Sequence, residues 1–257
     1  MLLRRLVVGL KQQHWLSITI ELVIVIIGVF IANLVTGWNE ERAQREQTRR
    51  MLDQLRPEVA NELTFFKTAR NYYANARRYS FQALAGWQGD HTLTDEQFAI
   101  AAYQASQIYG IGINPQNWSL TFGGNQLRDI DNPRLRQTLA TVLVADYEPV
   151  GFNSVASPYR EHVRLVIPAD VQDDIRQRCG DRTVTLASGF QYVALPPTCP
   201  LHLPPDRAAA TAAALRAHPE LAGELNGHLA AVANYLANAD GLEANLRAFK
   251  KELDAHP

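Results

Sequence analysis

The longest run of apolar residues lies near the N-terminus, between Trp15 and Trp38. From Leu22 to Val35, its only strongly polar side chain is that of Asn33. At about 1.5 Å per helical residue, the stretch would be roughly 35 Å long, enough to cross a hydrocarbon layer of about 30 Å. Indole rings prefer the headgroup level of a bilayer, and one stands at each end. The pattern predicts a transmembrane helix in the lipid bilayer, with Trp15 and Trp38 as its membrane-interface anchors.

A cleaved signal peptide is the alternative interpretation of this segment, because Arg4 and Arg5 give it a basic start. The apolar run is longer than that of a signal peptide, and no small-x-small cleavage motif precedes Trp38. The pattern therefore favours a permanent anchor.

Beyond the anchor, the pattern stays helical. Residues 39–56 are almost free of glycine, proline and β-branched residues and carry dense mixed charges, which is typical of a solvated helical stalk. From Leu52 to Tyr73, apolar residues recur at helical spacing, which predicts a face that packs on a partner helix. Pro57 predicts a kink or a restart, and the pattern ends near Gly86.

Cap signals divide the middle of the chain into shorter helices. Gly110 stands where the first of these would end. The predicted starts are a capping box of Thr94 and Gln97, then Asn114-Pro115, Asn132-Pro133 and Ser157-Pro158, with a bend or restart at Pro168.

The period changes between the two cysteines, where residues 183–186 and 191–195 form short β-prone runs typical of a hairpin. A proline-rich connector follows, then an alanine-rich helix capped by Asp206 and a long amphipathic helix starting at Pro219. The predicted fold is all-α: an N-terminal transmembrane helix followed by a helical-bundle domain with one small β-hairpin insert.

The chain has 257 residues, and the roughly 220 beyond the anchor suffice for one domain. Its formal net charge of −1 gives no electrostatic footprint for nucleic acid, so we expect no nucleic-acid partner. The expected organisation is a cytoplasmic tail over 1–14, the transmembrane helix over 15–38, the stalk over 39–56 and a periplasmic helical bundle over 57–257.

Charge counting alone leaves the orientation close to a tie. The two flanks carry Arg4, Arg5 and Lys11 on one side and Arg42, Arg45, Arg49 and Arg50 on the other. A short basic tail is easily retained in the cytoplasm, and an oxidising space gives the cysteines a role. We therefore expect a single-pass protein of a bacterial inner membrane, with the N-terminus cytoplasmic and the C-terminal domain periplasmic.

The two cysteines, Cys179 and Cys199, bracket the predicted hairpin. A hairpin is marginal by itself in water, and a disulfide would fix it in place. Both residues stand beside glycine or proline at predicted loop boundaries, which favours a disulfide over the alternative of two buried free thiols.

One face of the anchor carries small or ionisable residues at spacings of seven, four and four: Glu21, Gly28, Ala32 and Thr36. Small residues let helix backbones approach closely, and ionisable groups within a membrane usually face protein or water. The face predicts packing on another transmembrane helix, from a second copy or a partner protein. An equally weighted alternative is that Glu21 lies near enough to the interface to reach the headgroups.

Two segments carry recognisable patterns. The first combines the intramembrane Glu21 with Gly28 and the exit sequence Trp-Asn-Glu-Glu-Arg at 38–42; the second is residues 124–136. Together they resemble a bacterial family of single-pass membrane-anchored proteins of unknown function. The resemblance implies the topology and a helical domain after the anchor. It transfers no catalytic residue.

A search for chemistry identifies no catalytic residue and no cofactor motif. None of the seven histidines has ligand spacing on a helix, so we expect no metal. Four residues of the middle region could line an anion or small-ligand pocket, although surface arginines around an aromatic core explain them more simply. They are Trp118, Arg128, Arg136 and Tyr159.

Two hypotheses of function follow. The first is a non-enzymatic interaction, scaffold or ligand-binding module that acts with a membrane partner. The second is a cell-envelope enzyme whose site lies in the middle loops. The first is favoured because the sequence assembles no nucleophile, base and orienting group.

Overall fold

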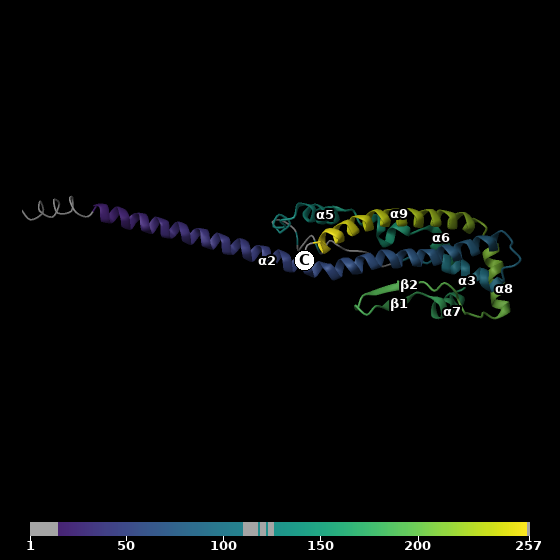
Figure 1. The fold of residues 1–257 in the computed structure, drawn as a ribbon. Helices are drawn as coiled ribbons and strands as arrows, with labels where there is room; N and C mark the ends of the chain where they lie inside the picture. Colours follow the sequence, from purple (N-terminus) through teal and green to yellow (C-terminus); the bar gives the residue numbers. More distant parts are fainter. Residues whose placement is uncertain (1–14, 110–117, 119–121, 123–125, 256–257) are drawn as a thin grey trace, which may run out of the picture.

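The computed structural model describes residues 15–109, 118, 122 and 126–255, which form a helical bundle carried on one long helix (Figure 1). That helix, α2 (Trp15–Trp87), has 73 residues. The described part contains seven α-helices and one two-stranded sheet, which confirms the predicted all-α fold with a small hairpin. The other elements are α3 (Asp95–Ala105), α5 (Pro133–Val144), the 3-10 turns η1 (Glu148–Val150) and η2 (Phe152–Val155), α6 (Pro158–Val166), α7 (Ala169–Cys179), β1 (Arg182–Thr185), β2 (Gln191–Ala194), α8 (Pro205–Arg216) and α9 (Glu220–Asp254).

Helix α2 continues through Pro57, so the restart expected there is wrong. A proline inside a helix removes one backbone hydrogen bond. Pro57 is exposed, whereas Leu55 and Val59 on either side are buried in the core. Tertiary packing of these neighbours holds the helix together across the missing bond.

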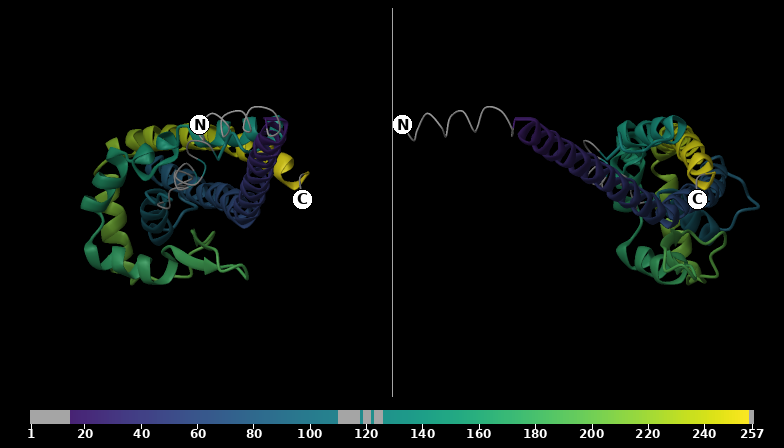
Figure 2. Two further views of the ribbon diagram at one scale, coloured as in Figure 1. Left: turned by 90° about the vertical axis from the view of Figure 1, so that its left-hand side faces the viewer. Right: turned by 60° about the vertical axis from the view of Figure 1, so that its left-hand side comes forward.

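Helices α2 and α9 lie side by side and antiparallel, and they form the frame of the bundle (Figures 1 and 2). Arg56 Nη1 lies 3.5 Å from Asp254 Oδ1, and further along the pair the Tyr73 and Tyr235 ring centroids are 5.1 Å apart. Because the end of α9 meets the last residue of the stalk, the C-terminal helix returns toward the apolar segment.

Helix α3 is the central helix of the core. All its residues from Phe98 to Ala105 are buried. Phe98 packs on the end of α2, where its ring centroid is 5.1 Å from that of Trp87. Gly86 makes this approach possible, because a Cβ atom at that position would lie 2.1 Å from Phe98 Cδ2.

The helix starts follow the predicted caps in most places. Thr94 and Gln97 form both bonds of the capping box, and the Asn132 side chain accepts from the backbone N–H groups of Arg134 and Leu135. Helix α8 starts at Pro205 rather than with Asp206 as the cap. Proline is pre-organised for a first helical turn, which places Asp206 inside the helix.

The end of α3 differs from the prediction. The helix stops at Ala105 instead of running to Gly110, because the backbone N–H and the hydroxyl of Ser106 both donate to the Tyr103 carbonyl and close the last turn. Gly110 and the helix start expected at Asn114-Pro115 lie outside the described residues.

The hairpin pairs Arg182 with Ala194 at one end and Thr185 with Gln191 at the other. Gly189 supplies the positive φ of 82° in its turn. The segment after β2 is attached to α2, because Asn75 Nδ2 donates to the Leu195 carbonyl at 2.8 Å. Helix α2 therefore supports the connector that follows the hairpin.

Cys179, at the end of α7, is bonded to Cys199 in the connector after β2. Their Cα atoms are 5.1 Å apart, within the range of disulfides. The predicted pairing is therefore the one in the structure. It closes the segment that contains the hairpin onto the helical core, where Cys179 is fully buried.

Candidate functional site

The apolar part of α2 extends away from the bundle (Figure 1). Within the described residues, this is one helix long and apolar enough to cross a membrane. Its large side chains from Ile20 to Val35 are exposed, and so is Trp38. The Trp15 backbone belongs to α2, whereas its side chain lies outside the described part.

The predicted face of Glu21, Gly28, Ala32 and Thr36 lies on this exposed segment, so no part of the bundle covers it. A Cβ atom at Gly28 would meet nothing within 4 Å. The Thr36 hydroxyl donates to the Ala32 carbonyl at 2.9 Å, which satisfies the hydroxyl within its own helix. The face is thus open for another helix.

The bundle begins shortly beyond the apolar segment. Thr48 is the first buried residue of the stalk, with 5% of its surface exposed. Between the stalk and the segment before α5 lies a groove of about 270 Å³. Arg45 and Arg49 line one wall of this groove, and Asp129 and Asp131 line the other.

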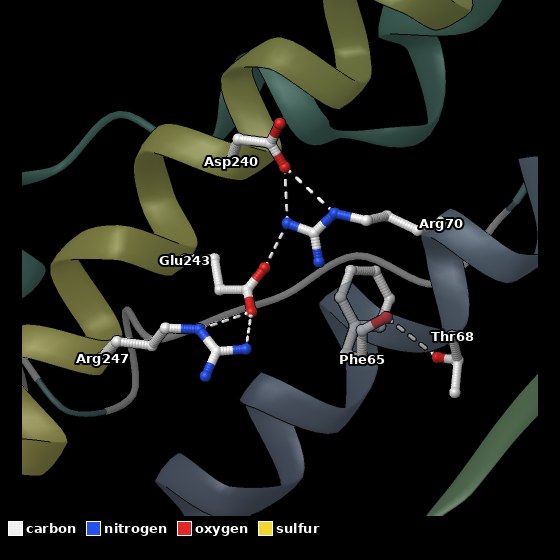
Figure 3. Close-up of polar contacts among 6 residues, drawn as sticks. All are labelled: Phe65, Thr68, Arg70, Asp240, Glu243 and Arg247. Atoms are coloured by element: carbon white, nitrogen blue, oxygen red, sulfur yellow. Dashed lines mark hydrogen bonds and ion pairs between the residues drawn. The ribbon is translucent and has the colours of Figure 1, made fainter.

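An ion-pair cluster joins α2 to α9 deeper in the bundle (Figure 3). Arg70 on α2 donates from Nε to Asp240 at 3.0 Å and also pairs with Glu243. The Glu243 side chain is only 4% exposed, and Arg247 pairs with its second oxygen. The buried Glu243 carboxylate is paired with one guanidinium from each helix, so this cluster holds the two long helices in register.

A second polar cluster lies between α6 and α9. Ser157 Oγ is 2.9 Å from His228 Nδ1, and His162 Nδ1 is 2.8 Å from Glu224 Oε1. Burial, and then the charge of Arg160, lowers the pKa of His228 to about 4. Its imidazole is therefore neutral at pH 7.

Two atoms of this second cluster have no hydrogen-bond partner among the described residues: His228 Nε2 and Glu224 Oε2. A serine against an imidazole is the first half of a nucleophilic pair. However, His228 is only 1% exposed, so a substrate has no direct access to it from solvent.

Two carboxylates lie one turn apart on α2, at Glu58 and Glu62. Burial, and then the negative charge of Glu58, raises the pKa of Glu62 to about 7. The Trp118 indole N–H donates to Glu58, and the charge of Glu62 helps raise the pKa of Tyr147. The Glu62 side chain is half-buried, and with a pKa of about 7 its carboxyl group titrates near neutral pH.

The four residues of the predicted pocket are not gathered at one place. Trp118 contacts Glu58 and Phe249, whereas the Tyr159 hydroxyl donates to the Ala102 carbonyl at 2.7 Å. Arg128 is exposed. Arg136 is half-buried and donates to the Ile130 carbonyl at 3.3 Å, which makes it a support of the segment before α5.

Sequence reasoning missed both titrating clusters. The spacing of Glu58 and Glu62 places them on one helix face, which was a usable signal. Ser157 and His228 are 71 positions apart, and no local pattern links them. Within residues 15–109, 118, 122 and 126–255, no group of three or more potential ligands could hold a metal ion.

A scan against protein-family models finds no matching family, and searches of curated proteins and of solved structures find no matching protein.

Proposed function

We propose that this chain is a membrane-anchored, non-enzymatic interaction module that acts with another transmembrane helix. The observation that carries the proposal is the continuity of α2, which runs without a break from the apolar segment into the buried core. A change in the tilt or rotation of the anchor would reach the bundle directly, because no flexible linker separates them.

The open face of the anchor supplies the contact. Gly28 and Ala32 would let a second helix approach closely, and a neighbouring helix would shield Glu21 from lipid. That helix comes from a second copy of this chain or from a partner protein in the same membrane.

Replacing Gly28 by leucine is expected to abolish crosslinked oligomers or partner adducts of the full chain in membranes, because the added side chain separates the helix backbones. Gly37→Leu is the matched control, since Gly37 lies on the opposite side of the helix and also has nothing within 4 Å of its Cβ position. Equal crosslinking in the parent and the Gly28→Leu variant would refute the helix contact.

The proposed location is a bacterial inner membrane, with the N-terminus in the cytoplasm and the bundle in the periplasm. The Cys179–Cys199 pairing supports it, because structural disulfides persist in oxidising compartments. A reporter active only in the periplasm, fused after Pro257, is expected to be active. Activity of a cytoplasm-only reporter at the same position would reverse the orientation.

The second candidate function is a cell-envelope enzyme. The contact between Ser157 and His228 is the observation in its favour. Its weakness is that the second imidazole nitrogen has no described acidic partner to orient it, and that His228 is closed to solvent.

A further inference from the structure

The stalk carries an arginine stripe, which we define as Arg42, Arg45 and Arg49. With Trp38, these residues follow one another at spacings of four, three and four, so their Cα atoms lie on one face of α2. Arg50 and Glu46 lie on a neighbouring face and pair with each other. The arginines of the stripe therefore lie on the same face of α2 as Trp38, on its C-terminal side.

The lower end of the stripe lies at the level where lipid headgroups would be. At 1.5 Å per residue, the Cα atoms of Arg42, Arg45 and Arg49 stand about 6, 10 and 16 Å beyond Trp38. The headgroup layer of one leaflet is about 5 to 7 Å thick. Helical side chains lean toward the N-terminus, which here is the direction of the apolar segment, so Arg42 and Arg45 both reach this layer.

The contacts of these arginines agree with that placement. The Arg42 guanidinium carbon lies 6.0 Å from the centroid of the Trp38 ring, which directs its charge toward the interface. Arg45 pairs with Glu41 at 3.1 Å in an exposed and therefore weak ion pair. Within the part of the chain that the structure describes, Arg42 and Arg49 have no acidic side chain at ion-pair distance.

Acidic side chains lie next to the end of the stripe that is farther from the apolar segment. Asp129 and Asp131 face Arg45 and Arg49 across the groove between the stalk and the segment before α5. An anion that approaches from solvent meets these carboxylates. At the end of the stripe nearer the membrane, Glu40 lies on the opposite face of α2 and Glu41 is paired with Arg45, which leaves Arg42 facing an anion at the membrane surface. The charge distribution therefore favours a ligand held at the membrane surface.

We propose that the arginine stripe binds the phosphate groups of anionic phospholipids in the leaflet next to the bundle. Guanidinium groups bind phosphate through paired hydrogen bonds, and the net negative charge of an anionic lipid distinguishes it from a zwitterionic one. The inference rests on the proposed anchoring of α2 in a bilayer, but it is independent of which side of the membrane the bundle occupies.

The test uses the full chain reconstituted into nanodiscs of phosphatidylcholine with a minority of phosphatidylglycerol. The lipids that remain bound after mild extraction are measured by native mass spectrometry. The parent chain is expected to retain phosphatidylglycerol preferentially. Arg42→Gln should lower this preference by about fivefold at low salt, and Arg42→Lys should keep most of it, because a lysine also carries the charge.

Arg50→Gln is the matched control, since it removes the same charge from the same stalk outside the stripe. It is expected to leave the preference unchanged. An equal loss in Arg42→Gln and Arg50→Gln, or equal retention of both lipids by the parent chain, would overturn the inference. A parent chain that fails to insert into nanodiscs would instead overturn the anchoring on which the proposed function depends.

Discussion

At pH 8, the Glu62→Gln variant is expected to be more stable than the parent chain by up to about 3 kcal/mol, and the difference should vanish near pH 4. Burial, and then the charge of Glu58, raises the pKa of Glu62 to about 7 from an ordinary value of 4.5. The folded chain therefore holds this proton more tightly than the unfolded chain. The stability that results is complete below pH 4.5 and is lost as the pH rises through 7.

His228 has the opposite effect over almost the same range. Its pKa falls from 6.5 to about 4 because of burial and the charge of Arg160, so its contribution is complete above pH 6.5 and is lost as the pH falls through 4. The two slopes oppose each other between about pH 4.5 and 6.5. In the parent chain, the pH dependences that Glu62 and His228 give to the free energy of unfolding largely cancel over this range. In the Glu62→Gln variant, the pH dependence due to His228 remains and can be measured.

The measurement is the free energy of unfolding of the full chain in detergent, taken at several pH values for parent and variant. Glu161→Gln is the control, because Glu161 is an exposed glutamate on α6 and receives the same substitution. A difference between Glu62→Gln and the parent that stays constant from pH 4 to pH 8 would contradict the assigned role of Glu62.

Replacing both Cys179 and Cys199 by alanine is expected to lower the free energy of unfolding by roughly 3 kcal/mol, the chain-entropy value for a closed loop of about this length. The sequence separation of the pair is 20. Without the crosslink, the hairpin and connector are held by noncovalent contacts alone, such as the bond from Asn75 on α2 to the Leu195 carbonyl, and a two-stranded hairpin is marginal by itself.

Reduction supplies the control for this variant. A reductant should destabilise the parent chain by a similar amount and leave the double variant unchanged. Thiol labelling of the denatured chain without reductant should find no reactive cysteine. Two labelled thiols per chain would show that the pair is reduced, and would also weaken the proposed periplasmic location.

Local chemistry explains which parts of the fold could be predicted. The capping box of Thr94 and the Asn132-Pro133 start depend on residues within one helical turn, and both form as expected. The restart at the exposed Pro57 was wrongly predicted because the packing of Leu55 and Val59 against distant helices decides whether α2 continues.

The polar clusters were harder to predict for the same reason. The Arg70 contact with Asp240 spans 170 positions, and it depends on how α9 returns along α2. Trp118 and Tyr159 illustrate the converse, because both are buried aromatic residues that contact α9. Trp118 packs at Phe249 and Tyr159 at His228, which lie far apart along that helix, so the two do not share a pocket.

Because α2 is continuous, a tilt of its apolar segment in the membrane would displace the far end of the bundle sideways. From Trp38 to Trp87, the helix would extend about 74 Å at 1.5 Å per residue. If the anchor tilts by about 20°, an ordinary value for single helices in bilayers, the far end of the bundle moves sideways by roughly 25 Å. The ion pairs of Arg70 make α9 move with it. The thickness and composition of the bilayer would thus set how far from the anchor the tip of the bundle can meet a neighbour.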